Sequence, residues 1–380
     1  DKAKSSSDSV LAACKGAGSL DAISWPTPSV GQTRAVICPN NGQVLLAASR
    51  RMAKGEDVRI ARGERDWAHP SWLGHLLFGL PPTKEVSLGF ISGELAARLP
   101  VGVTPAEAHR ALQRACQCGN ANPKVRDVVV ALNRAQKFEQ LPPSDPKLNP
   151  VVFSTIHRSK GREFDEVAYV DYVPWEGSEE PTPGYNQRMR FVGLSRAKQR
   201  NFSLEVGEKV LLAKPGKSER WVEFRFLAKG TRGLHAAEVG VQGDVDPVSF
   251  VRYPTFAEAQ AAQSSMLELC KRGETVDLVL GQSTVAGAAP LYSIIHRASG
   301  RKVGEMSARF TRDIQATRHS LQGWGGDFPP PVRLEGCWVR GVFTATPGDC
   351  ESMDGLPAEV AAGLIWCYVE VEGFAKAIWP

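Results

Sequence analysis

The sequence predicts an α/β protein in which a parallel sheet with a helical insertion is followed by a smaller α+β domain rich in antiparallel strands. Strand–helix–strand order over residues 34–60 is typical of a parallel sheet, and similar order returns over 148–205. Beyond the polar segment 214–220, apolar and alternating runs follow one another at short intervals, as strands of an antiparallel sheet do.

The first unit can be followed residue by residue. "RAVIC" suits a short buried strand, and Asn40 or Asn41 then offers a helix N-cap. "QVLLAASRRMAK" places apolar residues at helical spacing, Gly55 suits the helix C-terminus, and "DVRI" starts the next strand. Residues 1–33, which begin without Met, are interpreted as a truncated or flexible lead-in.

Residues 61–147 predict a helical insertion within this domain. The segments "GLPPTK" and "LPPSDPKLNP" indicate loops. Between them, "TPAEAHRALQRAC" opens with Thr104, Pro105 and Glu107, which together predict a capping box, and "PKVRDVVVALNRAQKFEQL" predicts a second helix. We expect the whole first domain to span 34–213.

The remaining elements follow in order. "PVVFSTIH" and "EVAYVDYV" predict strands, "QRMRFVGLSRAKQ" a helix and "RNFSLEV" a further strand, after which 214–220 is the expected linker. Residues 221–380 then form the accessory α+β domain. Most of its tryptophans are expected in the core, and Glu370 and Glu372 on a solvated strand face.

Composition excludes several classes of protein. Hydrophobic content of 42%, charged content of 23% and the lack of a long apolar run indicate a globular protein with no membrane partner. The net charge of +5 permits a polyanionic partner. The eight cysteines form no CxxC pair, so we expect no metal site and a reducing, cytoplasmic setting.

Two segments carry residues that suit chemistry. "STIHRSKGREF" places Thr155, His157, Lys160, Gly161 and Glu163 within nine positions, ahead of an apolar strand. About thirty residues later comes "RMRFVGLSRAK", which contains Arg188 and Arg196. A solvated loop and an ordinary basic helix are the plain alternatives for either segment alone.

These segments closely resemble the fifth and sixth motifs of superfamily 1 helicases of the UvrD/Rep/PcrA type. The resemblance covers roughly residues 30–205 and implies a RecA-like domain, the second of two in such enzymes. It implies that Arg196 is an arginine finger and that Gly161, Glu163 and Arg188 lie at the nucleotide. The DNA-contacting residues would be Thr155, His157 and Lys160.

The resemblance also implies cofactors and partners. The expected function is that of the C-terminal portion of an ATP-dependent DNA helicase, with ATP and Mg²⁺ held mainly by a first RecA-like domain. The only Gly-Lys-Ser, at 216–218, has Leu211 where a P-loop needs its first glycine, so this chain contains no P-loop and should not hydrolyse ATP alone. Single-stranded DNA is the expected partner, and RNA stays open.

Departures from the family pattern leave an alternative. Tyr185, Asn186 and Gln187 stand where acidic residues usually precede Arg188, and Arg162 stands where an apolar residue usually follows the glycine. The alternative is a non-catalytic helicase-like scaffold that binds nucleic acid or a partner protein. Basic stretches at 296–302 and 309–320 would suit either partner through the accessory domain.

Overall fold

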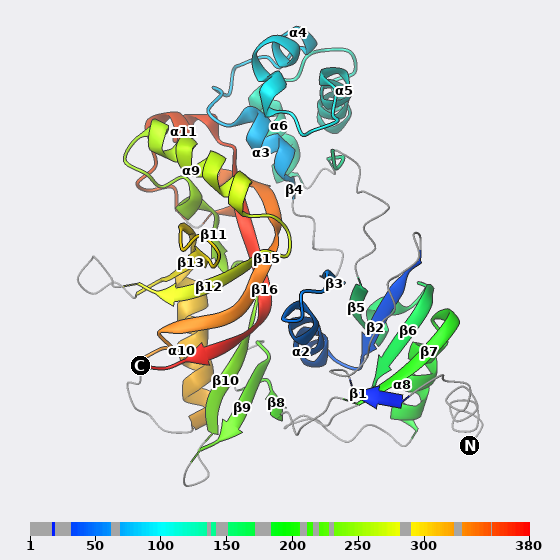
Figure 1. The fold of residues 1–380 in the computed structure, drawn as a ribbon. Helices are drawn as coiled ribbons and strands as arrows, with labels where there is room; N and C mark the ends of the chain where they lie inside the picture. The colour runs from blue at the N-terminus through cyan, green and yellow to red at the C-terminus, as the bar shows by residue number, and fades with distance from the viewer. Residues whose placement is uncertain are drawn as a thin grey trace.

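The chain folds around two sheets, one parallel and one antiparallel (Figure 1). This confirms the coarse α/β prediction. The computed structural model describes residues 17–19, 32–61, 69–134, 138–141, 151–171, 184–205, 211–215, 220–227, 232–281, 290–322, 329–350 and 352–380.

The parallel sheet has six strands in the order β1-β7-β6-β2-β5-β3. Its strands are β1 (Ala17–Ser19), β2 (Arg34–Cys38), β3 (Val58–Ile60), β5 (Val151–Thr155), β6 (Phe164–Val170) and β7 (Ala197–Glu205). Its helices are α2 (Asn41–Met52), α7 (Ile156–Ser159) and α8 (Tyr185–Leu194). The central strand β2 is buried along its whole length, as expected for a strand covered on both faces.

Helices cover both faces of this sheet. Val36 and Cys38 of β2 pack with α2, whereas Ala35 and Ile37 pack with Leu194 at the end of α8. Of the two candidate N-caps, Asn40 is the one used, because its side-chain oxygen accepts a hydrogen bond from the backbone N–H of Gln43 at 2.9 Å. The alternation of side chains along β2 thus sends successive residues into two separate cores.

A second unit, which we name the helical module, comprises the described residues within 69–141. Its elements are β4 (His69–Pro70), α3 (Ser71–Leu77), α4 (Leu88–Phe90), the π-helix η1 (Ile91–Leu95), the 3₁₀-helix η2 (Ala96–Arg98), α5 (Pro105–Cys116) and α6 (Val125–Asn133). The predicted capping box is confirmed: Thr104 and Glu107 bond reciprocally at the start of α5. The second predicted helix is shorter than its pattern and ends at Asn133.

The antiparallel sheet has ten strands in the order β11-β14-β13-β12-β15-β16-β10-β9-β8, with β4 beside β15. Its other strands are β8 (Leu211–Ala213), β9 (Val222–Phe226), β10 (Arg232–Val239), β11 (Val245–Asp246), β12 (Thr275–Leu280), β13 (Tyr292–His296), β14 (Lys302–Met306), β15 (Arg333–Ala345) and β16 (Trp366–Ile378). The helices of this domain are η4 (Pro247–Phe250), α9 (Phe256–Leu269), α10 (Ala308–Gln322), η5 (Pro347–Asp349) and α11 (Ala358–Gly363). Strand β8 pairs with β9, so this sheet begins before the expected linker.

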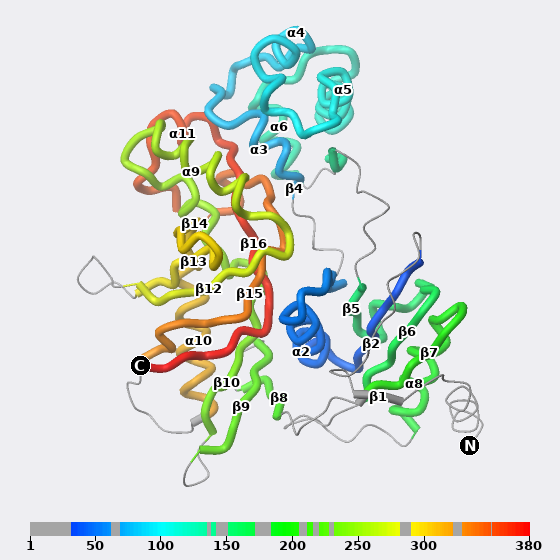
Figure 2. Tube along the Cα trace, viewed as in Figure 1, coloured from blue at the N-terminus to red at the C-terminus, as the bar shows by residue number. Residues whose placement is uncertain are grey.

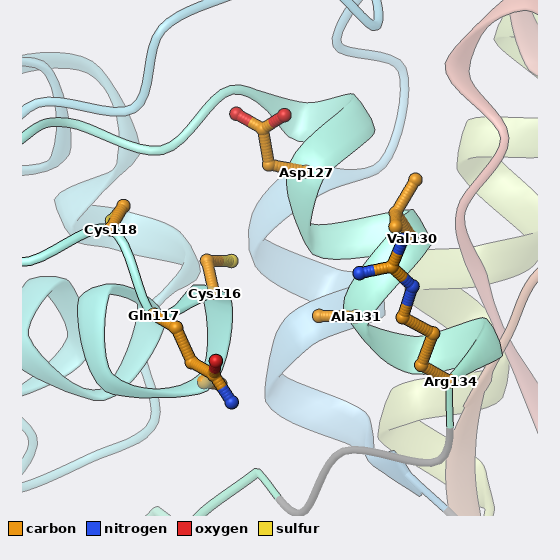
Figure 3. A pocket seen from close by; sticks show the side chains of 8 residues that line it. Cys116, Gln117, Cys118, Asp127, Val130, Ala131 and Arg134 are labelled. Atoms are coloured by element: carbon orange, nitrogen blue, oxygen red, sulfur yellow. The ribbon is translucent and has the colours of Figure 1, made fainter.

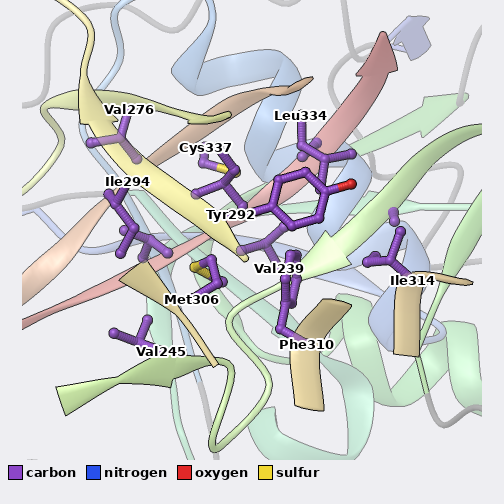
Figure 4. Close-up of a cluster of buried hydrophobic side chains, with 14 of the residues drawn as sticks. Val239, Val245, Val276, Tyr292, Ile294, Met306, Phe310, Ile314, Leu334 and Cys337 are labelled. Atoms are coloured by element: carbon purple, nitrogen blue, oxygen red, sulfur yellow. The ribbon is translucent and has the colours of Figure 1, made fainter. Parts of the chain in front are cut away.

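The core of the antiparallel domain lies between the sheet and α10. Figure 4 shows Phe310 and Ile314 of α10 pointing toward Tyr292 and Met306 on the strands. The rings of Tyr292 and Phe310 meet edge to face at 5.6 Å, and both are fully buried. The hydroxyl of Tyr292 donates to the Pro331 carbonyl at 2.7 Å, which satisfies the one polar atom that this ring brings into the core.

Tryptophans lie where the sequence places them, but two acids do not. Trp221, Trp338 and Trp366 are buried, as predicted, whereas Trp324 lies outside the described residues. The solvated strand face expected for Glu370 and Glu372 is wrong. Glu372 is 5% exposed and accepts a hydrogen bond from the Trp338 indole at 3.2 Å, and Glu370 pairs with Arg340.

The antiparallel domain also packs against the parallel sheet. Trp338 of β15 belongs to the same buried cluster as Val36, and the backbone N–H of Phe374 donates to the Ser49 hydroxyl of α2 at 2.9 Å. Gly42 has no room for a side chain, because a Cβ there would lie 2.5 Å from the ring of Trp221. The trace in Figure 2 shows β15 and β16 running past α2.

Every helix in the described part of the chain is too short or too polar to cross a bilayer. The seven cysteines that the structure describes are free thiols, and Cys14 lies outside the described residues. Burial raises the pKa of Cys38, Cys337 and Cys367 well above the usual range of a thiol. These three therefore behave as small apolar residues of the core.

Candidate functional site

The first motif folds as a capped turn at the end of β5. The Thr155 hydroxyl accepts a hydrogen bond from the Arg158 N–H at 3.4 Å and so begins the short helix α7. After this helix, the Arg162 N–H donates to the Ser159 carbonyl, and Lys160 has φ −57° and ψ 131°. Gly161 has φ +76°, which completes the dihedral pattern of a type II turn.

Gly161 serves conformation rather than packing. A Cβ built at this glycine would have nothing within 4 Å, so space alone does not require its absence. The positive φ is what requires glycine, because residues that carry a Cβ rarely adopt this angle at low cost. Lys160 and Gly161 are both exposed at this turn.

The second motif meets the first at the amino ends of β6 and β7. The backbone N–H of Phe164 donates to the Arg196 carbonyl at 2.9 Å, and Phe164 pairs with Ala197 in the parallel ladder. Glu163 and Arg196, the residues just before these two strands, therefore lie side by side. The Glu163 carboxylate is 3.5 Å from the Lys198 ammonium, and both side chains are more than half exposed.

The predicted site residues fall into separate groups. Thr155 pairs with Cys38 at the carboxyl end of β2, and His157 follows it, exposed, on α7. Gly161, Glu163 and Arg196 lie at the opposite, amino end of the sheet. Lys160 directly precedes Gly161 on the turn.

Arg188 is not brought to the amino edge. It is exposed on α8, eight residues before Arg196, which corresponds to about 12 Å along a helix axis. Its neighbour Arg190 contacts the Ser203 hydroxyl at 3.2 Å and Asp171 at 3.4 Å, near the carboxyl ends of β7 and β6. The structure thus separates Arg188 from the other residues predicted at the nucleotide.

The guanidinium of Arg196 lies against the end of the preceding helix α8. Its Nε donates to the Val192 carbonyl at 3.1 Å, and one terminal nitrogen donates to the Ser195 hydroxyl at 3.0 Å. The side chain is half-buried and carries its charge outside the hydrophobic core. To reach a phosphate it would exchange these two hydrogen bonds for bonds to phosphate oxygens, which its planar fork suits.

The strand ends at this edge are held in place by Thr33 and Asp165. The Thr33 N–H donates to the Asp165 carboxylate at 2.7 Å, and the Asp165 N–H donates to the Thr33 hydroxyl at 3.0 Å. Hydrogen bonds from the Thr33 backbone and hydroxyl lower the pKa of Asp165, and the charge of Lys198 lowers it further. Sequence reasoning missed Thr33 and Asp165, because only the pairing of β2 with β6 brings them together.

Just inside the same edge, a ladder of charged side chains crosses three strands and is centred on a buried carboxylate. Arg34 of β2, Glu166 of β6 and Arg200 of β7 pair in register on neighbouring strands. The Arg34 guanidinium lies 2.6 Å from the Glu166 carboxylate, Arg200 also contacts that carboxylate, and Glu166 is fully buried. Burial lowers the pKa of Arg34, and the charge of Arg200 lowers it further. The ladder ties together the strands that carry both motifs.

Two hollows lie elsewhere among the described residues, in the helical module. One, of about 250 Å³, lies between α5 and α6. Figure 3 shows Cys116 pointing toward it from one side and Arg134 on the other. A neighbouring hollow of about 280 Å³ borders Arg110 and Arg114. Both are smaller than typical ligand pockets, and neither contains a predicted site residue. Burial raises the pKa of Cys116 to about 12, so its thiol is not an activated nucleophile.

Among the described residues, no group of three or more His, Cys, Asp or Glu side chains is arranged to hold a metal ion. The described part of the amino edge therefore offers exposed cations and the Glu163 carboxylate, without a group of side chains suited to a metal ion. Compared with known proteins, the chain matches no family model and no curated protein sequence.

Proposed function

We propose that this chain is the second RecA-like half of a UvrD-like, ATP-dependent DNA translocase, followed by an accessory domain. A first RecA-like domain would bind Mg-ATP and place it against the amino edge of the parallel sheet. Single-stranded DNA would contact Thr155 and His157 near the other end of the sheet. The proposal rests on the helicase-motif resemblance and on the arrangement of these residues.

The observation that carries the proposal is the hydrogen bond between Phe164 and Arg196. It joins two segments about thirty residues apart, so that Glu163 and Arg196 reach one edge while Thr155 is left at the other. One short segment, 155–163, then spans the sheet between the two groups. If the bound nucleotide shifts this segment, the shift also moves the proposed nucleic-acid contacts at Thr155 and His157. A translocase requires such coupling between its two ligands.

Each residue then has a defined task. The Glu163 carboxylate accepts hydrogen bonds from ribose hydroxyls, and the open backbone at Gly161 lets the nucleotide approach closely. The Arg196 guanidinium leaves Val192 and neutralises charge that develops on the transferred phosphoryl group. Thr155 and His157 donate to phosphate oxygens of the nucleic acid, which fixes its position without reading its sequence.

The arginine finger is tested in the polypeptide that joins this chain to its P-loop domain. Arg196→Ala should keep nucleotide binding and lose ATPase turnover by about 10³-fold or more, the usual effect of an arginine finger. Arg188→Ala, the same change on the preceding helix α8, should lose far less, because Arg188 lies away from Glu163. Equal turnover of Arg196→Ala and the parent would remove the assignment.

Nucleic-acid binding is tested with the chain itself. Fluorescence anisotropy with a labelled oligo-dT should show weaker binding by His157→Ala, and the loss should be similar for oligonucleotides of different sequence. Gln260→Ala is the control, because Gln260 is also exposed but lies on α9, away from the two basic stretches. Competition with oligo-rU decides between DNA and RNA. Identical affinity of His157→Ala and the parent would contradict the proposed contact.

A second candidate function is a non-catalytic helicase-like scaffold. The observation that favours it is the position of the Arg196 guanidinium, which bonds to Val192 and Ser195 at the end of the preceding helix α8. The absence of acidic residues at 185–187 favours it as well. If Arg196→Ala and the parent polypeptide both bind oligo-dT equally and both lack ATPase, the scaffold is the better description.

A further inference from the structure

The helical module is attached to the antiparallel domain, although in sequence it interrupts the parallel-sheet domain. Its strand β4 pairs with β15, His69 opposite Thr344 and Pro70 opposite Phe343. Figures 1 and 2 both show the module above the antiparallel sheet and apart from the parallel sheet. The antiparallel sheet thus continues into the module.

A buried threonine hydroxyl joins the two units. The Thr344 hydroxyl donates to the Pro70 carbonyl at 2.6 Å and accepts from the Gly74 N–H at 2.9 Å, and Thr344 is 2% exposed. It therefore satisfies a donor and an acceptor in the first turn of α3, which would otherwise be buried without partners. At the end of α6, the Thr346 hydroxyl donates to the Asn133 side-chain oxygen at 2.7 Å.

Backbone-to-backbone packing leaves no room for sliding at this junction. A Cβ at Gly74 would lie 2.7 Å from both the Cys367 sulfur and the Trp366 carbonyl oxygen. A Cβ at Gly79 would lie 2.4 Å from the Phe256 ring, and the neighbouring Phe78 stacks on that ring at 5.5 Å. Interfaces packed this tightly do not deform continuously, because any shift creates clashes or voids.

On its other side, the antiparallel domain contacts the parallel-sheet domain through the packing of Trp338 and through the hydrogen bond between Phe374 and Ser49. We propose that the accessory domain is the scaffold that fixes the helical module relative to the parallel sheet, so that the module is a rigid arm and not a swinging subdomain. This inference is independent of the proposed function, since it concerns only contacts within the chain.

The test is a distance measurement between spin labels by pulsed electron paramagnetic resonance. One label replaces Val101, which is 96% exposed on the module, and the other replaces Ala53 after α2, with accessible native cysteines removed. The parent chain should give one narrow distance distribution. Gly74→Ala, which forces a methyl group into the junction, should broaden it or add a second distance. Gly93→Ala is the control, because a Cβ there has nothing within 4 Å.

Thr344→Val provides a milder second perturbation if Gly74→Ala prevents folding. It keeps the branched shape of the side chain and removes only the hydroxyl, and it should also broaden the distribution. A broad or multiple distance distribution in the parent chain would overturn the proposal directly. So would folded Gly74→Ala and Thr344→Val chains whose distributions match that of Gly93→Ala.

Discussion

Asp244→Asn removes one charge from a buried ion pair in the antiparallel domain. Arg220 and Asp244 are 2% and 3% exposed, and two guanidinium nitrogens meet the two carboxylate oxygens at 2.9 and 2.7 Å. The carboxylate also accepts the N–H groups of Gly240 and Val241. The pair therefore holds the turn after β10 against the segment that leads into β9.

The cost follows from what remains around Arg220. Breaking a buried pair by removing one partner usually costs about 3–5 kcal/mol, because the other charge stays buried without compensation. Here Asp313 at 3.3 Å and the Glu238 carbonyl at 2.7 Å still face the guanidinium, and the asparagine oxygen can still accept from Gly240. We therefore expect the lower end, about 3 kcal/mol of unfolding free energy.

Urea unfolding followed by tryptophan fluorescence measures this loss. The matched control is Glu335→Gln, which removes the charge from a pair with Arg333 at 3.4 Å whose side chains are 47% and 38% exposed. An exposed pair of this kind contributes about 0–1 kcal/mol. An unfolding free energy for Asp244→Asn equal to that of Glu335→Gln would refute the reasoning that burial gives the pair its weight.

Two further predictions concern the turn at Gly161 and three partly buried histidines. Gly161→Ala and Gly55→Ala, both at positive φ with open space around them, should each cost about 1 kcal/mol of unfolding free energy. In the polypeptide that joins this chain to its P-loop domain, only Gly161→Ala should lower ATPase turnover, and an equal loss for Gly55→Ala would contradict a local role of the turn at Gly161. Burial lowers the pKa values of His69, His75 and His235. Because the unfolded chain binds their protons near pH 6.5 and the folded chain does not, stability should fall as the pH drops below this value. A urea midpoint at pH 5.5 equal to or above that at pH 7.5 contradicts this.

Local sequence patterns were enough to predict the individual helices and strands. The capping box at Thr104, the cap at Asn40 and the buried tryptophans all depend on neighbours in sequence or on the size of the apolar side chain. The two motif segments were also visible, because their residue types and order are unusual for solvated turns. Hydrogen bonds within a few residues and simple burial decide all of these features.

Features that depend on pairing between segments far apart in the chain could not be predicted from the sequence. The solvated face expected for Glu372 failed because Trp338, thirty-four residues earlier, lies opposite it on a neighbouring strand and covers it. The ladder of Arg34, Glu166 and Arg200 has the same origin, since strand register alone aligns its three charges. No periodicity within one strand reports which residue the next strand will place beside it.

By itself, the sequence determined the α/β character of the chain, its main strands and helices, and the two segments that carry candidate chemistry. Only the tertiary structure decided that Glu163 and Arg196 share one edge, that Arg188 lies apart from them, and that the helical module belongs with the antiparallel sheet. The physical reason is range. Helix caps and side-chain periodicity act over a few residues, whereas strand register and domain contacts join segments separated by tens to hundreds of residues.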